Sequence, residues 1–444
     1  MSGADSALEG VAPLADRDWW RRRPARSQDV SVGVEAPPPN LSFWALITFT
    51  VILLLAPQQT IMPFLSPLHI AMLSVAVAVA AHALDWLRGR APLVQRGPIV
   101  LLSMLLLLWA AASVSYSLWP GGSLGTITGI FIKALIISWL LGAIVIGTVR
   151  LRHLVWVLSL IAIPVGFTAL SHFSSGTVLE ISNMATARIA GYDAPLASNP
   201  NDLALLLNII LPLTAALALI EERTWRRLLL AGVMALSAAA IVATFSRAGF
   251  LSLAFTGVMY LWRFRSRLDF RWLGAIALLG VLALPLVPGR YYGRLATILN
   301  KNSDPTGSAQ LRYGDMMLAA RYIAAHPVIG AGIGSDILVL NDLRGPRWTK
   351  VHDVYLEIGM DLGLPGLLLF LLLMGYCFRA VGRIRRGRPQ SGVPPDLRWL
   401  AEGLWISLAT FAVSAVFYPA SYEFFFYYLA GLAVAMRATV EGSR

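Results

Sequence analysis

Long runs of apolar residues alternate with short polar or arginine-bearing segments along most of the chain. A helix needs about 20 consecutive apolar residues to cross a bilayer, and most of these runs reach or approach that length. We therefore expect an all-α, polytopic integral membrane protein with about twelve transmembrane helices, the first and last runs being short. The approximate limits of the runs are 41–57, 64–86, 98–117, 124–147, 152–172, 199–220, 227–246, 248–264, 272–288, 353–378, 399–418 and 423–438.

The segments between the apolar runs alternate along the chain between arginine-bearing segments and segments with few or no positive charges. Arginines fill every second segment, whereas the short segments near 58–63, 118–123 and 419–422 contain no lysine or arginine. Cytoplasmic loops of membrane proteins carry such an excess of positive charge. The pattern predicts that both termini are cytoplasmic. The arginine-bearing positions include Arg21, Arg22, Arg23, Arg88, Arg90, Arg96, Arg150, Arg152, Arg223, Arg226, Arg227, Arg263, Arg265, Arg383 and Arg385.

The composition agrees with this class. Charged residues make up 14% of the chain and apolar residues 57%, with a mean hydropathy of +0.67, whereas soluble proteins carry about 25% charged residues. The net charge of +12 lies between apolar runs and not on a compact basic domain, so we expect membrane lipids and no nucleic acid as partners. The single cysteine, Cys377, excludes an internal disulfide.

Residues 1–40 and 41–444 differ in character. The first part contains "RDWWRRRPARS" and "APPPN" and lacks the apolar core of a signal peptide. We interpret residues 1–40 as a disordered, basic cytoplasmic tail, either merely solvated or touching the inner leaflet. Residues 41–444 are interpreted as a single transmembrane domain.

Two outer segments are long, residues 173–198 and 289–352, and both carry positive charge. Long loops are exempt from the charge rule, so this excess indicates either a solvated loop or a site for an anionic ligand. Within the second, "SAQLRYGDMMLAARYIAAHP" predicts an amphipathic helix with Leu311, Leu318, Tyr322 and Ala325 on one face. We interpret the following "GAGIGS" as turn glycines, because it lacks the lysine and the preceding strand of a phosphate-binding loop.

Three arginines are candidate ligands for an anion. Arg188 precedes "SNPNDLALLLNIILP", where Asn199 or Asn201 is expected to cap a helix. Arg247 lies in "ATFSRAGFLSL" at an outer turn, where a charge faces a cavity or snorkels to the headgroups. Arg312 lies on the amphipathic helix, as a ligand or as a solvated charge. Helix N-termini favour anions, which strengthens the reading for Arg188.

His352 stands at the outer edge of the run 353–378, next to Asp353 and one turn before Tyr355. An imidazole titrates near neutral pH, so His352 is either a general base or a structural histidine. No histidine pair has metal-binding helical spacing with a carboxylate, and we predict no metal. Lys133 and Asp361 lie inside apolar runs without an evident partner, and the role of Lys133 stays open.

Four stretches together resemble the superfamily of O-antigen ligases and polymerases, which are bacterial envelope glycosyltransferases. The resemblance covers roughly residues 180 to 375 and rests on "ARIAGY…SNPNDLALLLNIILP", "TFSRAG", "LRYGDMM…HPVIGAGIGS" and "VHDVYLEIGMDLGLPGLLLF". The residue after the family's histidine is often Asn, Ser or Gln, whereas Asp353 follows here, which affects the hydrogen bonding expected around the histidine.

The resemblance implies a glycan transfer from undecaprenyl diphosphate to an acceptor hydroxyl at the periplasmic face of the bacterial inner membrane, without metal, nucleotide or other cofactor. His352 would be the general base, and Arg188 and Arg247 would hold the diphosphate, with Arg312 as a further candidate. The acceptor would be lipid A-core for a ligase or a growing glycan for a polymerase, and ligation is favoured. A transporter of lipid-linked glycan and a structural scaffold are the alternatives from other classes; the oligomeric state is unknown.

Overall fold

The computed structural model describes residues 40–60, 62, 64, 68–175, 178–179, 188–189, 191–192, 194, 196–265, 308–387 and 393–442. Most of the predicted tail, the predicted run 272–288 and the start of the long segment 289–352 lie outside the described residues.

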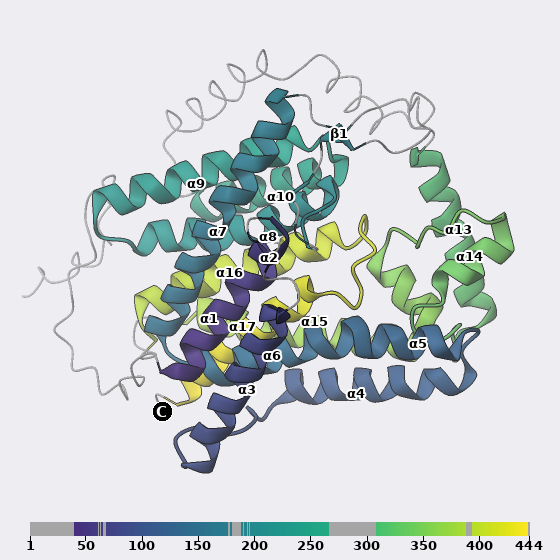
Figure 1. Ribbon diagram of the computed structural model, residues 1–444, viewed down its shortest axis with the longest axis horizontal. Helices are drawn as coiled ribbons and strands as arrows, with labels where there is room; N and C mark the ends of the chain where they lie inside the picture. Colours follow the sequence, from purple (N-terminus) through teal and green to yellow (C-terminus); the bar gives the residue numbers. More distant parts are fainter. Residues whose placement is uncertain are drawn as a thin grey trace, which may run out of the picture.

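The described part of the chain is almost entirely helical (Figure 1). Among the described residues, eight helices are long and apolar enough to cross a membrane. The prediction of an all-α, multi-pass membrane protein is confirmed, and the count of twelve spans is not confirmed. The elements are α1 (Leu41–Leu55), α2 (Pro57–Thr60), α3 (Ile70–Leu87), α4 (Pro98–Ser113), η2 (Val114–Tyr116), α5 (Pro120–Thr126), η3 (Ile127–Phe131), α6 (Ile132–Ile144), α7 (Thr148–Ser175), β1 (Val178–Leu179), β2 (Arg188–Ile189), α8 (Pro200–Ile220), α9 (Thr224–Ala243), α10 (Arg247–Phe264), α13 (Ser308–Ala325), α14 (Asp336–Arg344), α15 (Val354–Arg385), α16 (Pro395–Ser414) and α17 (Phe424–Glu441).

Some predicted runs differ from the helices. The run 124–147 corresponds to α5, η3 and α6, which follow one another without a gap from Pro120 to Ile144. The run 64–86 becomes a helix only at Ile70. The two short strands β1 and β2 form one antiparallel pair within the outer segment 173–198, a local turn that leaves the fold class unchanged.

Ion pairs tie the helices together at one end of the bundle, which we call the arginine-rich end. Arg152 contacts Glu221 at 3.0 Å, joining α7 to the residue after α8. Arg263 and Arg385 both contact Glu402, at 3.0 and 3.1 Å, joining α10 and α15 to α16. These arginines are the ones that the charge pattern grouped on one side of the membrane. The opposite end, where α8, α10, α15 and α17 begin, is called the loop end.

Small polar side chains pair between helices in the interior. Ser252 and Thr256 of α10 lie 2.7 Å from Ser414 and Thr410 of α16, respectively, and all four are buried. Such pairs satisfy hydroxyl groups away from water and contribute about 0.6 kcal/mol on average between transmembrane helices. They fix α10 against the end of α16.

The helix α15 is broken at Gly363, where φ is +67° and ψ is −174°. The break frees backbone groups that need other partners. The Met360 and Asp361 carbonyls accept from the N–H groups of Ala331 and Gly332, and the Trp109 indole of α4 donates to the Leu362 carbonyl at 2.8 Å. The Leu364 N–H donates to the Pro327 carbonyl at 2.8 Å. The segment after α13 therefore runs along the break and completes it.

The elements α13 and α14 pack against the first part of α15 at the loop end (Figure 1), and Ile333, between them, bonds to Ser113 of α4 and Ser123 of α5. The predicted amphipathic helix is present as α13, but its predicted face is partly wrong. Leu318 and Tyr322 pack inward, whereas 47% of Leu311 is exposed and Ala325 is also exposed. The buried residues of α13 are Asp315, Ala319 and Ile323, because Arg344 neutralises Asp315 at 2.6 Å and Ile323 lies over Gly359 of α15.

Candidate functional site

His352 lies at the loop end, on the short connection between α14 and α15, and its backbone is held on both sides. The Val351 N–H donates to the Asp336 carboxylate at 3.0 Å. Asp353 caps α15, accepting from the Leu356 N–H at 2.9 Å, and the Val354 N–H donates to the carbonyl of Ala415, just after α16. Short loops fixed in this way present a side chain in a defined direction.

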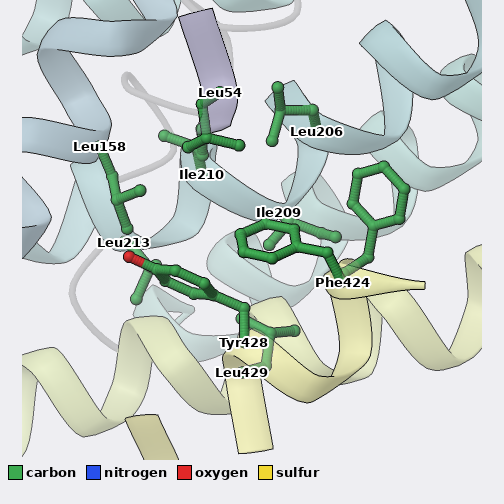
Figure 2. Close-up of a pocket in the computed structure, with 10 residues that line it drawn as sticks. Leu54, Leu158, Leu206, Ile209, Ile210, Leu213, Phe424, Tyr428 and Leu429 are labelled. Carbon is green, nitrogen blue, oxygen red and sulfur yellow. The ribbon is translucent and has the colours of Figure 1, made fainter. Parts of the chain in front are cut away.

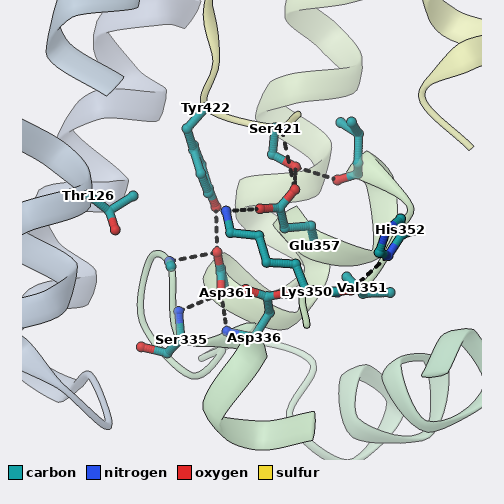
Figure 3. Close-up of polar contacts among 12 residues, drawn as sticks. Thr126, Ser335, Asp336, Lys350, Val351, His352, Glu357, Asp361, Ser421 and Tyr422 are labelled. Atoms are coloured by element: carbon teal, nitrogen blue, oxygen red, sulfur yellow. Dashed lines mark hydrogen bonds and ion pairs between the residues drawn. The ribbon is translucent and has the colours of Figure 1, made fainter. Parts of the chain in front are cut away.

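The imidazole of His352 has a defined hydrogen bond of its own (Figure 3). Its Nδ1 lies 3.0 Å from the Lys350 carbonyl oxygen. A carbonyl can only accept, so Nδ1 must carry the proton in the neutral ring and Nε2 must carry the lone pair. The ring is half-buried. The arrangement leaves Nε2 as the basic atom of a neutral imidazole.

A buried carboxylate, Glu357, anchors the residue two positions before His352. Glu357 is fully buried on the first part of α15. One of its oxygens lies 2.8 Å from the Lys350 ammonium nitrogen, and the other accepts from the Ser421 hydroxyl at 2.5 Å. Both oxygens are therefore satisfied, which offsets the cost of burying the charge.

Asp361, one turn further along α15, is also fully buried and has four donors. The backbone N–H groups of Gly334, Ser335 and Asp336 donate to it at 2.7, 3.1 and 2.9 Å, and the Tyr422 hydroxyl donates at 3.1 Å. Gly334 belongs to the "GAGIGS" stretch and has a positive φ of +74°, as turn glycines do. The N–H groups of the loop are thus engaged by the protein's own Asp361 carboxyl group.

Burial and neighbouring charges perturb the groups around this cluster. Burial, and then the Glu357 carboxylate, raise the pKa of Asp336 to about 7. The Glu357 carboxylate raises the pKa of Lys350 above its usual range. Burial, and then Asp202 on α8, raise the pKa of Glu423, the residue before α17, to about 7. Perturbed groups gather at functional sites, and here they surround the segment that carries His352.

Arg247 is the first residue of α10, at a point where two helix N-termini meet. Ser246 caps α10, accepting from the Gly249 N–H at 3.1 Å. The same hydroxyl donates to the Asn201 side chain at 2.9 Å, in the first turn of α8. Of the two predicted caps, Asn199 and Asn201, it is Asn199 that caps α8. Two positive helix ends and a half-buried arginine therefore lie together at the loop end.

Arg247 begins α10 and His352 lies two residues before α15, and both helices pack on α16. The start of α15 contacts the end of α16 through the Tyr355 hydroxyl, which donates to the Ala412 carbonyl at 2.8 Å, and α10 contacts it through Ser252 and Ser414. Arg312 is half-buried on α13, which packs against α15. The backbone of Arg188 pairs with Leu179 in the β1–β2 turn, and its side chain lies outside the described part.

An apolar cavity between α1, α7, α8 and α17 has no part in this cluster (Figure 2). Leucine, isoleucine and phenylalanine line it almost entirely, with Tyr428 as the single residue bearing a polar group. Such a lining offers no base and no cation.

The sequence analysis missed most members of this cluster. It regarded Asp361 as unpartnered, and it gave no role to Lys350, Glu357 or Asp336. A signal was present, because two carboxylates four residues apart within an apolar run share one helix face. Their partners come from residues far away along the chain and could not be inferred from spacing.

A family model described as O-antigen ligase matches residues 232–371. The matched segment extends from within α9 past the break of α15, and it includes Arg247, Arg312 and His352 but not Arg188. No curated protein sequence matches the chain. The matched residues are those that form most of the loop-end cluster, so this part of the chain is similar to the O-antigen ligase family.

Proposed function

We propose that this protein transfers a glycan from undecaprenyl diphosphate to an acceptor hydroxyl at the periplasmic face of the bacterial inner membrane, most simply O-antigen to lipid A-core. The observation that carries the proposal is the geometry of His352. Its Nδ1 faces the Lys350 carbonyl, so that Nε2 is the basic atom of a neutral ring at the loop end of an apolar bundle.

The reaction needs a base for the acceptor and a stabilised leaving group. The acceptor oxygen attacks the anomeric carbon and its proton passes to Nε2 of His352. The bond between that carbon and the diphosphate oxygen breaks, and the electron pair leaves with the diphosphate. General-base help of this kind contributes about 10²–10⁴-fold. A single displacement inverts the configuration at the anomeric carbon.

The leaving diphosphate gains negative charge as the bond breaks, and cations there lower the barrier. Arg247 stands at two converging helix N-termini, which supports a role as diphosphate ligand. Arg188 and Arg312 are proposed as further ligands. A guanidinium remains charged and can bind phosphate oxygens in pairs, which suits this task.

The proposed periplasmic location of the site rests on the distribution of charged residues. Ion-paired arginines gather at the arginine-rich end, which by the positive-inside rule faces the cytoplasm. The loop end then faces the periplasm, where the carrier's diphosphate lies at headgroup level while its lipid chain remains in the bilayer.

Purified protein in proteoliposomes with lipid-linked O-antigen and lipid A-core tests the proposal. The wild type should yield core-linked glycan with inverted configuration, and His352→Ala should lower the rate by at least ~10²-fold while its melting temperature stays within the range of the wild type. Glycan growth on the carrier lipid without core modification would instead identify a polymerase. Unchanged transfer by His352→Ala would refute the role of the histidine.

A further inference from the structure

The peptide group between Lys350 and Val351 has both of its polar atoms engaged, on opposite sides. Its carbonyl oxygen faces Nδ1 of His352 at 3.0 Å. Its N–H donates to the carboxylate of Asp336 at 3.0 Å. A trans peptide is planar, with C=O and N–H pointing in opposite directions, so fixing one end fixes the other. Asp336 therefore controls the direction of the carbonyl that orients the histidine.

A second carboxylate holds the same residue from its side chain. The Lys350 ammonium lies 2.8 Å from Glu357, and Glu357 is in turn fixed by the Ser421 hydroxyl. The backbone of this segment is thus held by α14 and its side chain by α15 (Figure 3). Rotation of the Lys350–Val351 peptide would break its hydrogen bonds to Asp336 and His352, while the ion pair with Glu357 holds the Lys350 residue in place.

These carboxylates are costly as purely structural elements. Asp336 and Glu357 are both fully buried, and one oxygen of Asp336, Oδ1, has no hydrogen-bond partner within the described residues. Apolar residues of similar volume often stabilise a protein as well as buried charges do. Carboxyl groups buried at such a cost, on either side of a candidate base, indicate a requirement for precise geometry.

We propose that Asp336 is a positioning residue, supported by the Lys350–Glu357 ion pair, which holds the Lys350 carbonyl against Nδ1 of His352 and so keeps Nε2 unprotonated and directed at the acceptor. This inference rests on the proposed role of His352. The carboxylate also polarises the peptide group that it binds, which strengthens the carbonyl as an acceptor. Asp336 itself touches no reacting atom.

The decisive comparison is between Asp336→Asn and Asp336→Leu. Asparagine keeps an oxygen that can accept from the Val351 N–H, whereas leucine fills the space without an acceptor. Asp336→Asn should retain kcat within a few-fold of the wild type. Asp336→Leu should lower kcat by ~10²-fold, the loss expected for a misplaced catalytic group, with KM changed little. Thr256→Val, a buried and nearly isosteric change in the α10–α16 interface, is the matched control and should change neither.

Two further measurements separate positioning from general destabilisation. In a His352→Ala background, Asp336→Leu should cause no additional loss of rate, because the two residues act as one unit. Nitrogen-15 NMR of histidine-labelled protein in liposomes, with the His352 signals assigned by their absence in His352→Gln, reports the tautomer directly. The wild type and Asp336→Asn should show protonated Nδ1 at neutral pH, and Asp336→Leu a mixture of tautomers.

The outcomes distinguish this inference from the proposed function. A wild-type His352 protonated at Nε2 and not at Nδ1 overturns the inference, even if Asp336→Leu does not fold. Unchanged kcat and tautomer in folded Asp336→Leu overturn it as well. If His352→Ala retains full transfer, the proposed function fails, while the NMR result still decides whether Asp336 positions the ring.

Discussion

Replacing Gly363 by alanine should severely destabilise the loop end, because this glycine makes the break in α15. Its φ of +67° and ψ of −174° fall in a region that is essentially restricted to glycine, where another residue costs about 1–3 kcal/mol. A Cβ atom would also stand 2.5 Å from the Val328 carbonyl oxygen. Backbone atoms cannot rotate away, so the segment after α13 would have to move.

That movement has its own cost. It would disturb the hydrogen bonds of Leu364 to Pro327 and of Ala331 to Met360, both 2.8 Å long and each worth about 0.5–1.5 kcal/mol. The sum for Gly363→Ala is then about 2–6 kcal/mol. Gly375→Ala is the matched control on the same helix, since no atom lies within 4 Å of its Cβ position; it should stabilise by about 0.5–1 kcal/mol.

Thermal unfolding of the purified, full-length variants in one detergent, followed by tryptophan fluorescence at a fixed scan rate, measures the difference. The apparent melting temperature should fall clearly for Gly363→Ala and stay level or rise for Gly375→Ala. If the apparent melting temperature of Gly363→Ala equals or exceeds that of Gly375→Ala, the glycine is not required at the break, and the account of α15 is wrong.

The remaining predictions concern charged groups at the loop end. Asp336 has a pKa raised to about 7 by burial and by Glu357, so its contribution to stability is present below its ordinary pKa near 3.8 and is lost as pH rises through 7; the melting temperature should fall between pH 5.5 and 8.5, and less so in Asp336→Asn. Asp361→Asn should destabilise by about 2–4 kcal/mol, because both carboxylate oxygens accept hydrogen bonds and an amide offers one acceptor; chemical denaturation that leaves its stability unchanged would contradict the four-donor arrangement. Arg344→Leu together with Arg347→Leu removes both cations that contact the buried Asp315 and should cost about 3–5 kcal/mol, and adding Asp315→Leu should restore part of that loss; a triple variant less stable than the double one would argue against an uncompensated charge.

Much of the fold follows from the apolar runs because a membrane-spanning helix satisfies its own backbone, so its existence depends on local sequence alone. Runs such as 199–220 and 248–264 closely match α8 and α10. The break in α15 is different. The run 353–378 looks continuous, and only "GLPG" hints at an interruption; what makes the break tolerable is the segment near Pro327 and Trp109 of α4, which are distant in sequence.

The residues of the candidate site can be separated in the same way, into those that local sequence identifies and those that depend on distant contacts. His352 could be singled out because a titratable ring at the edge of an apolar run is unusual, and Arg247 because a charge beside hydrocarbon needs a reason. Asp336 could not, since an aspartate after "GAGIGS" reads as an ordinary helix N-terminal residue. Its importance arises only when α14 folds back on the connection to α15 and its carboxylate meets the Val351 N–H.

The two buried aspartates at the loop end illustrate how one helix break organises the whole cluster. Ending the first part of α15 at Gly363 leaves Asp361 within reach of three successive backbone N–H groups, and these groups form the start of α14. Binding them fixes the first residue of α14, which is Asp336, and Asp336 in turn fixes the peptide before Val351. The orientation of His352 thus depends, through Asp361 and Asp336, on Gly363, eleven residues later in the chain. A candidate base on a loop can be held rigidly in this way, because each contact in the series ends on a helix of the bundle.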